Sequence, residues 1–261
     1  MSRLVRPPAA IDYPSSDGKP LAENDAQLHA ILYAVGVLRL HYAERPDVYV
    51  SGDLLIYYEE GNPRVSVAPD AFVVFGVEDR VRMNYKVWEE GKGPDFVLEV
   101  ASPNTWREDV ERKPAVYAGL GVREYFLFDP LGEHLAPRLQ GHRLVDGAYE
   151  PMAAVESIDR TLTLASEVLG LELRAKPGGE MRFHEPAVGR DLLGHEETHA
   201  SWRAAEVRAE RQATARATAE MRAEQEATAR EAAEARAEQE ATAREAAEAR
   251  VAELEARLRD D

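Results

Sequence analysis

The stretch DFVLEVASPNTWREDVERKPAVYAGLGVREYFLFDP, residues 95–130, decides the fold of this chain. It holds two apolar runs, residues 96–101 and 124–128, whose Val, Phe and Tyr content is typical of buried strands. Between them, residues 105–118 predict a helix that Gly119 ends. This strand–helix–strand order is typical of an α/β fold.

The flanking sequence extends this pattern in both directions. Upstream, residues 24–40 predict a helix, because apolar side chains recur there at spacings of three and four. Residues 48–58 and 65–75 predict two strands that precede the quoted stretch. Downstream, residues 143–149 predict a hairpin and residues 181–183 a short β pair. The predicted core order is therefore helix, three strands, helix, strand.

Composition divides the 261 residues into three parts. Residues 1–20 are rich in Pro and Ser and are interpreted as an N-terminal arm. Residues 21–195 alternate apolar runs with Gly and Pro and predict one globular domain. Residues 196–261 contain neither Gly nor Pro and are dominated by Ala, Glu and Arg, which predicts one long helix.

The C-terminal segment contains a perfect internal repeat. Residues 222–235 read RAEQEATAREAAEA, and residues 236–249 repeat this sequence letter for letter. A repeat of two heptads favours a coiled coil and hence a homodimer, yet only Val251, Leu254 and Leu258 have convincing core spacing. Arg and Glu also alternate at four-residue steps, which stabilises a solitary helix by roughly 0.2–0.5 kcal/mol per pair. A solvated helical spacer and a loose dimerising coiled coil both remain open.

Composition and charge exclude several classes of protein and site. The chain has no cysteine, which excludes disulfides and thiolate metal sites and fits a reducing cytoplasm. Its longest apolar runs fall well short of the roughly 18 residues that a membrane helix needs, so no membrane association is expected. The net charge is −16, of which the segment from residue 201 contributes −4 and the rest −12. This acidity argues against tight non-specific DNA binding.

Two acidic residues interrupt otherwise apolar strands. Asp70 lies in VSVAPDAFVVFG, and Glu99 lies between Leu98 and Val100. A carboxylate inside an apolar strand is costly unless it is paired or binds a metal. A divalent cation between two such carboxylates removes their repulsion, and oxygen ligands suit Mg²⁺ or Mn²⁺. We therefore predict a metal site at Asp70 and Glu99, with the Val100 carbonyl as a further ligand.

Lys113 supplies a positive charge on the helix that follows Glu99. It is the only lysine between Lys92 and Lys176, and Asp109 shares its helix face at a spacing of four. A lysine here can hold a water or a phosphate as charge develops. The alternatives are ordinary ones: a turn residue for Asp70, an edge ion pair for Glu99, and surface side chains for Lys113 and Asp109.

These residues carry a resemblance to a known family. The run APDAFVVFG … PDFVLEVASP … ERKPAVYAGLGVREYFLFDP resembles the Uma family of restriction-endonuclease-like proteins, also called domain of unknown function 820. The resemblance covers roughly residues 15–195 and is most specific in residues 95–130. It implies membership in the PD-(D/E)XK nuclease superfamily, a mixed central sheet flanked by helices, and Mg²⁺-dependent cleavage of DNA phosphodiesters.

The resemblance also assigns roles to particular residues. The superfamily pattern has lysine two residues after the second acid, where this chain has Ala101. The resemblance implies that the lysine has moved to the next helix, which points to Lys113. Pro-Asp occurs at Asp70 and at Asp95; we assign the metal role to Asp70 and expect Asp95 to open its strand. In the early helix, Glu23 and His29 are the polar candidates for supporting the metal.

The residues and the resemblance together thus predict a metal-dependent endonuclease with Asp70, Glu99 and Lys113 as catalytic residues. The resemblance implies that DNA is its substrate. Ala101 and the acidic composition favour an alternative, a catalytically inactive nuclease fold that acts as a binding or scaffolding module through its C-terminal helix.

Overall fold

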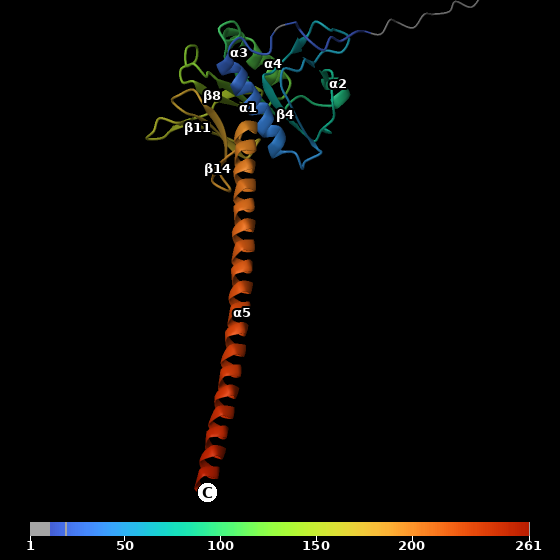
Figure 1. The fold of residues 1–261 in the computed structure, drawn as a ribbon. Coiled ribbons are helices and arrows are strands. Elements are labelled where there is room, and N and C mark those ends of the chain that lie inside the picture. The colour runs from blue at the N-terminus through green and yellow to red at the C-terminus, as the bar shows by residue number, and fades with distance from the viewer. Residues whose placement is uncertain (1–10, 19, 261) are drawn as a thin grey trace, which may run out of the picture. The chain divides into compact units, whose positions relative to one another are not determined.

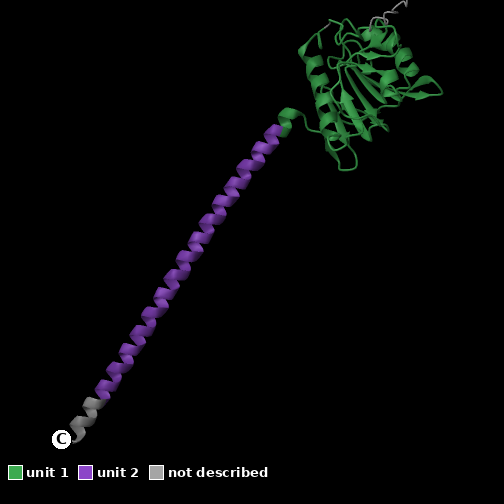
Figure 2. Ribbon diagram, turned by 90° about the vertical axis from the view of Figure 1, so that its right-hand side faces the viewer, with its two compact units in different colours: residues 1–198 green, residues 199–261 purple. Residues whose placement is uncertain are grey.

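The computed structural model describes residues 11–18 and 20–260, and for residues 253–260 the backbone only. It divides the chain into two compact units, residues 1–198 and 199–261 (Figure 2). The predicted N-terminal arm is described only at residues 11–18 and 20; its other residues lie outside the described part of the chain.

A six-stranded mixed sheet forms the centre of the first unit (Figure 1). Its strand order is β1-β4-β6-β7-β8-β9, and only β6 and β7 are parallel neighbours. The strands are β1 (Val48–Ser51), β4 (Ala71–Phe75), β6 (Phe96–Val100), β7 (Glu124–Phe128), β8 (Leu139–Val145) and β9 (Ala148–Pro151). All five residues of β6 and of β7 are buried, so these two strands are the core of the domain.

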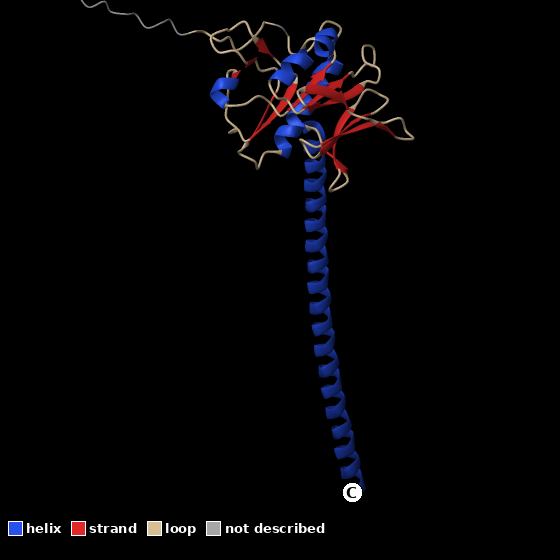
Figure 3. Ribbon diagram, turned by 180° about the vertical axis from the view of Figure 1, so that it is seen from behind, coloured by secondary structure: helices blue, strands red, loops and turns tan. Residues whose placement is uncertain are grey.

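Helices and further strands cover both faces of this sheet (Figure 3). Helix α1 (Asp25–His41) packs on β1, β4 and β6 and joins the apolar cluster that contains Phe96, Leu98 and Val100. The opposite face carries α3 (Trp106–Glu111) and α4 (Lys113–Gly119), together with a small sheet. That sheet has the order β3-β2-β5, from β3 (Ser66–Val67), β2 (Ile56–Tyr57) and β5 (Tyr85–Lys86), and α2 (Val87–Glu90) follows β5.

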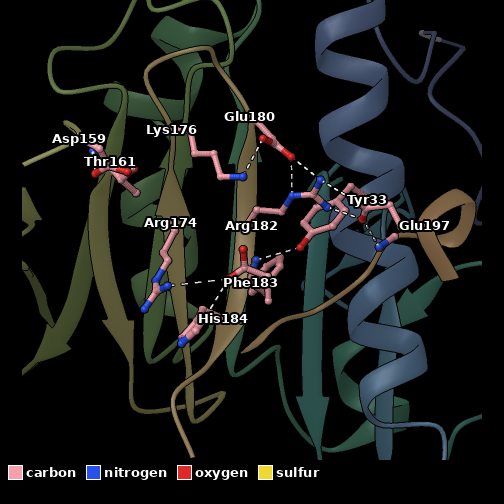
Figure 4. A network of polar contacts seen from close by, with 12 residues as sticks. Tyr33, Asp159, Thr161, Arg174, Lys176, Glu180, Arg182, Phe183, His184 and Glu197 are labelled. Atoms are coloured by element: carbon pink, nitrogen blue, oxygen red, sulfur yellow. Dashed lines mark hydrogen bonds and ion pairs between the residues drawn. The ribbon is translucent and has the colours of Figure 1, made fainter. Parts of the chain in front are cut away.

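A five-stranded antiparallel sheet packs on the α1 side of the core. It comprises β10 (Val155–Glu156), β11 (Leu162–Ser166), β12 (Leu171–Ala175), β13 (Met181–Glu185) and β14 (Arg190–Asp191). Tyr33 of α1 connects to it: its hydroxyl donates to the Leu192 carbonyl at 2.8 Å and accepts from the Phe183 amide at 3.0 Å. Arg182 lies over the Tyr33 ring and pairs with Glu180 and Glu197 (Figure 4).

The helices and strands in the most regular segments match the sequence predictions closely. Helix α1 begins after Asn24, whose side chain accepts a hydrogen bond from the Gln27 amide at 2.9 Å, and β7 has the predicted bounds. The predicted hairpin turns at Asp146-Gly147, which both have positive φ, as a two-residue turn of this kind requires. Its strands extend beyond the predicted residues on both sides.

Three elements that were predicted as continuous are each divided into two in the structure. The strand predicted at 48–58 is two strands, because the chain turns at Asp53, which has φ of 50°. The strand predicted at 65–75 is also two, because Pro69 has no N–H to donate to a ladder. The helix predicted at 105–118 breaks at Arg112, because Pro114 has no N–H for the carbonyl four residues earlier.

Helix α5 (His195–Asp260) contains the internal repeat. Apart from Thr218, every residue from 199 to 252 is exposed. Ion pairs at a spacing of four form between Arg216 and Glu220, Arg230 and Glu234, and Arg244 and Glu248. The side chains of Leu254 and Leu258 lie outside the described part, so the coiled coil and the homodimer stay predictions. No helix among the described residues is long and apolar enough to cross a membrane.

Gly52 permits close contact between the end of β1 and the start of β4. A Cβ at this position would lie 2.2 Å from the Asp70 carbonyl oxygen and 2.7 Å from a methyl group of Val35. We predict that Gly52→Ala lowers the free energy of unfolding by about 1–3 kcal/mol, because backbone must shift to admit the methyl group.

Gly36 is the matched control for this substitution. It lies inside α1, and apart from its chain neighbours and the helix's own backbone no atom lies within 4 Å of its would-be Cβ. Gly36→Ala should therefore raise the free energy of unfolding, by roughly 0.4–1 kcal/mol. Urea denaturation followed by tryptophan fluorescence measures both variants; equal effects of the two substitutions would contradict the proposed contact.

Candidate active site

Glu99 is the centre of the candidate site. It is fully buried on β6, where Phe96, Leu98 and Val100 face α1 and Glu99 faces α4. In the antiparallel pairing of β4 with β6, Ala71 lies opposite Leu98. Extending this register by one residue places Asp70 opposite Glu99, on the same face of the sheet.

Hydrogen bonds fix the two acids at the end of the strand pair. An Asp70 carboxylate oxygen accepts from the Val100 amide at 2.7 Å, and the Asp70 amide lies 3.4 Å from Glu99 Oε2. Asp70 remains partly exposed, whereas Glu99 has no exposed surface.

Lys113 points into the site. Its ammonium nitrogen lies 2.8 Å from Glu99 Oε1 and 2.8 Å from Asp109 Oδ1. Lys113 is 8% exposed, which excludes the alternative of an ordinary surface lysine. Ala101, at the position where the superfamily pattern has its lysine, is buried in the apolar cluster on the α4 face.

Asp109 is a member of the same cluster of charges. It is 1% exposed, so the alternative of a surface acid is wrong. The i,i+4 spacing survives the helix break at Arg112 and brings Asp109 against Lys113. The Asp109 carbonyl accepts a hydrogen bond from the Tyr125 hydroxyl at 2.7 Å, which anchors α3 to the central sheet.

Burial and mutual repulsion alter the acid–base properties of these groups. Burial, with the nearby Glu99 charge, raises the pKa of Asp70 well above its ordinary value. The same two causes raise the pKa of Asp109 to about 7. Burial opposes the charge of Lys113, but Glu99, Asp109 and Asp70 outweigh it and raise the lysine pKa. The cluster thus holds one firmly protonated amine among carboxylates that favour a cation.

Two further residues contact the site and were not predicted. The Tyr117 hydroxyl donates to Glu99 Oε1, and Tyr117 is fully buried. Gln27 of α1 donates from its side-chain amide to the Val100 carbonyl at 3.1 Å. Tyr117 follows Lys113 by four residues, so helix spacing could have identified it. Gln27 lies within an amphipathic helix, and only its burial at 4% exposure sets it apart.

The other predicted residues, Asp95, Glu23 and His29, have no hydrogen bond or ion pair to Asp70 or Glu99 within the described part of the chain. Asp95 opens β6 at the opposite end, where it binds the Phe75 amide, Lys92 and Arg123. Glu23 is exposed, and its carboxylate lies 3.4 Å from the Asn104 amide. His29 is exposed and lines a cavity with Tyr33 and Arg182, which contains none of the site residues.

Comparison with known proteins identifies the family. The model of the Uma2 family, described as “Putative restriction endonuclease”, matches residues 10–176. The chain belongs to the Uma2 family. The predicted family and the predicted α/β fold class are thereby confirmed. A crystal structure of a DUF820 protein from Anabaena variabilis, described as a putative nuclease, is similar at 15% identity and a TM-score of 0.38, covering 51% of this chain and 73% of that one. No curated protein matches.

Removing the ammonium group from this Uma2 site should destabilise the fold. In Lys113→Met, two buried carboxylates lose their counter-charge, and we predict a loss of about 3–5 kcal/mol in the free energy of unfolding without added metal. The control is Arg112→Gln, which breaks the more exposed Arg112–Glu108 pair and should cost less than about 1 kcal/mol. Urea denaturation in EDTA measures both; similar costs would contradict the burial of Lys113 among acids.

The raised pKa of Asp109 predicts a pH dependence of stability. Between its ordinary value near 3.8 and about 7, the folded protein keeps a proton that the unfolded chain has released. Stability therefore falls as pH rises through this window, by up to about 1.4 kcal/mol per pH unit for one proton. In EDTA, wild type should lose stability relative to Asp109→Asn between pH 4 and pH 7. Parallel stability profiles of the two proteins would refute the assignment.

Proposed function

We propose that this protein is a metal-dependent endonuclease that hydrolyses DNA phosphodiester bonds at Asp70, Glu99 and Lys113. The observation that carries the proposal is the convergence of these three side chains, from the residue before β4, from β6 and from α4, at one end of the central sheet. Membership in the Uma2 family supports the same reaction class. An apolar strand has no structural need for a fully buried carboxylate, which favours a chemical role for Glu99.

The donor set fits Mg²⁺ or Mn²⁺. Among the side chains of residues 11–18 and 20–252, no group of three or more Asp, Glu or His residues is arranged to hold a metal alone. Mg²⁺ is commonly held by one or two carboxylates and completes its octahedron with water and substrate phosphate. Asp70, Glu99 and the Val100 carbonyl would supply the protein ligands. A cation held there would polarise the phosphate and promote attack by water.

The chain's own residues would orient and stabilise the reacting groups. The Lys113 ammonium would stabilise the negative charge that grows on the phosphate during in-line attack. Asp109 is a positioning residue, because its ion pair keeps Lys113 directed at the carboxylates. Tyr117 fixes the rotamer of Glu99, and Gln27 fixes the orientation of the Val100 carbonyl. Burial of these groups excludes water and strengthens each electrostatic contact.

Cleavage of single-stranded, supercoiled and linear duplex DNA in Mg²⁺ or Mn²⁺ tests the proposal. We expect wild type to cut, and Asp70→Asn and Lys113→Met to lose at least about 100-fold in rate, the usual cost of removing a key electrostatic group. Lys86→Met is the control, because Lys86 pairs with Glu89 outside the site. Cleavage that survives both site substitutions would rule out this site.

Calorimetric titration with Mn²⁺ separates metal binding from turnover. Wild type should bind the ion, and Asp70→Asn should bind it at least about tenfold more weakly, whereas Lys86→Met should bind it as wild type does. Equal Mn²⁺ affinity in wild type and Asp70→Asn would remove Asp70 from the ligand set even if the protein cuts DNA.

A further inference from the structure

A stack of three side chains lies at the first turn of α3. The Trp106 and His134 rings are nearly parallel, at an interplanar angle of 9° and a centroid distance of 5.7 Å. The Arg107 guanidinium lies 5.2 Å from the centre of the Trp106 ring. These three residues, which we call the Trp106 stack, are not used in the proposed chemistry, although Trp106 also packs against the apolar cluster on the α4 face.

The Trp106 stack lies at the same sheet edge as the candidate site. Because β6 and β7 are parallel, the segments that follow them leave the sheet at one edge, and the Ala101 amide donates to the Phe128 carbonyl at 2.8 Å. Trp106 follows the end of β6, where its amide donates to the Ser102 carbonyl at 3.1 Å. Asp109, which holds Lys113, comes one helical turn later.

The loop that presents His134 is held in place before any ligand binds. The buried carboxylate of Asp129 accepts backbone amides at distances from 2.6 to 3.1 Å, those of Leu131, Gly132, His134 and Leu135. These bonds lower the pKa of Asp129 against the opposing effect of burial, so the carboxylate stays charged. A loop fixed in this way presents His134 without an ordering cost.

The Trp106 stack has spare binding capacity. Arg107 is exposed, and within the described part of the chain it forms no ion pair, whereas the nearby Arg112 is paired with Glu108. Trp106 and His134 are both partly exposed. Partly exposed flat rings beside an exposed cation suit a planar ligand that also carries negative charge.

Charge indicates which form of nucleic acid fits. Residues 1–200 carry 21 basic and 33 acidic side chains. This excess of negative charge disfavours binding of a duplex mainly through its phosphates. Single strands are bound largely by stacking of bases on aromatic side chains. Resting on the proposed function, we infer that the Trp106 stack binds an unpaired nucleobase beside the scissile phosphate, so that the substrate is single-stranded or locally unpaired nucleic acid.

Binding of oligonucleotides to the full-length chain in EDTA tests this inference without turnover. Fluorescence anisotropy compares a labelled 16-nucleotide DNA strand, its RNA counterpart and the same sequence as a duplex. We expect the single strands to bind more tightly than the duplex. Trp106→Ala and Arg107→Gln should each weaken single-strand binding, the former by about tenfold or more. Trp202→Ala is the matched control, because Trp202 is 62% exposed in the other unit.

Intrinsic fluorescence gives a second measurement that does not depend on the stability of Trp106→Ala. Single strands should quench wild-type fluorescence, and this quenching should be lost in Trp106→Phe and kept in Trp202→Phe.

Tighter duplex binding, or single-strand binding unchanged in Trp106→Ala and Arg107→Gln, would overturn the inference. Binding through Trp106 without any cleavage in metal would refute the proposed function alone. Duplex cleavage that is unaffected in Trp106→Ala would refute the inference alone.

Discussion

A carboxylate buried in the centre of the sheet constrains the rest of this structure. Glu99 lies on a strand with five buried residues, flanked by strands on both sides, and has no exposed surface. An unpaired charge in such a place costs several kcal/mol. The fold meets this requirement with the Lys113 ammonium at 2.8 Å and the Tyr117 hydroxyl, both from α4. Burial of Lys113 in turn requires Asp109, so one buried acid determines three further positions.

The topology explains why these groups meet. Parallel strands need a crossover, and the crossover from β6 to β7 consists of α3 and α4. It returns over the face of the sheet onto which Glu99 projects, which brings Lys113 above the acid without a lysine on the strand. The antiparallel strand β4 begins at the same edge and contributes Asp70. From the opposite face, Gln27 of α1 donates a hydrogen bond to the Val100 carbonyl. Helices on both faces of the sheet therefore contact the end of β6.

Much of this arrangement was predictable from local patterns. The two acids are conspicuous because apolar residues surround them, and Lys113 because lysines are scarce between residues 92 and 176. The burial of Asp109 was not predicted, because helix spacing shows which residues share a face but not which face is buried. Gln27 was missed because its partner is a backbone carbonyl 73 residues away. Pro69 is a local signal for the break between β3 and β4 that the prediction overlooked. The pairing of β2 and β3 in a separate small sheet is revealed by no local pattern.

The acidic composition of the chain is consistent with a site that binds a divalent cation. A site with this much negative charge favours a divalent cation, and it offers little attraction to a phosphate backbone until that cation is bound. Anomalous diffraction from crystals of the full-length chain soaked in Mn²⁺ tests the central claim most directly. The account predicts one peak about 2.1 Å from carboxylate oxygens of Asp70 and Glu99 and from the Val100 carbonyl. A site without a peak, with Lys113 still paired to Glu99, would contradict it.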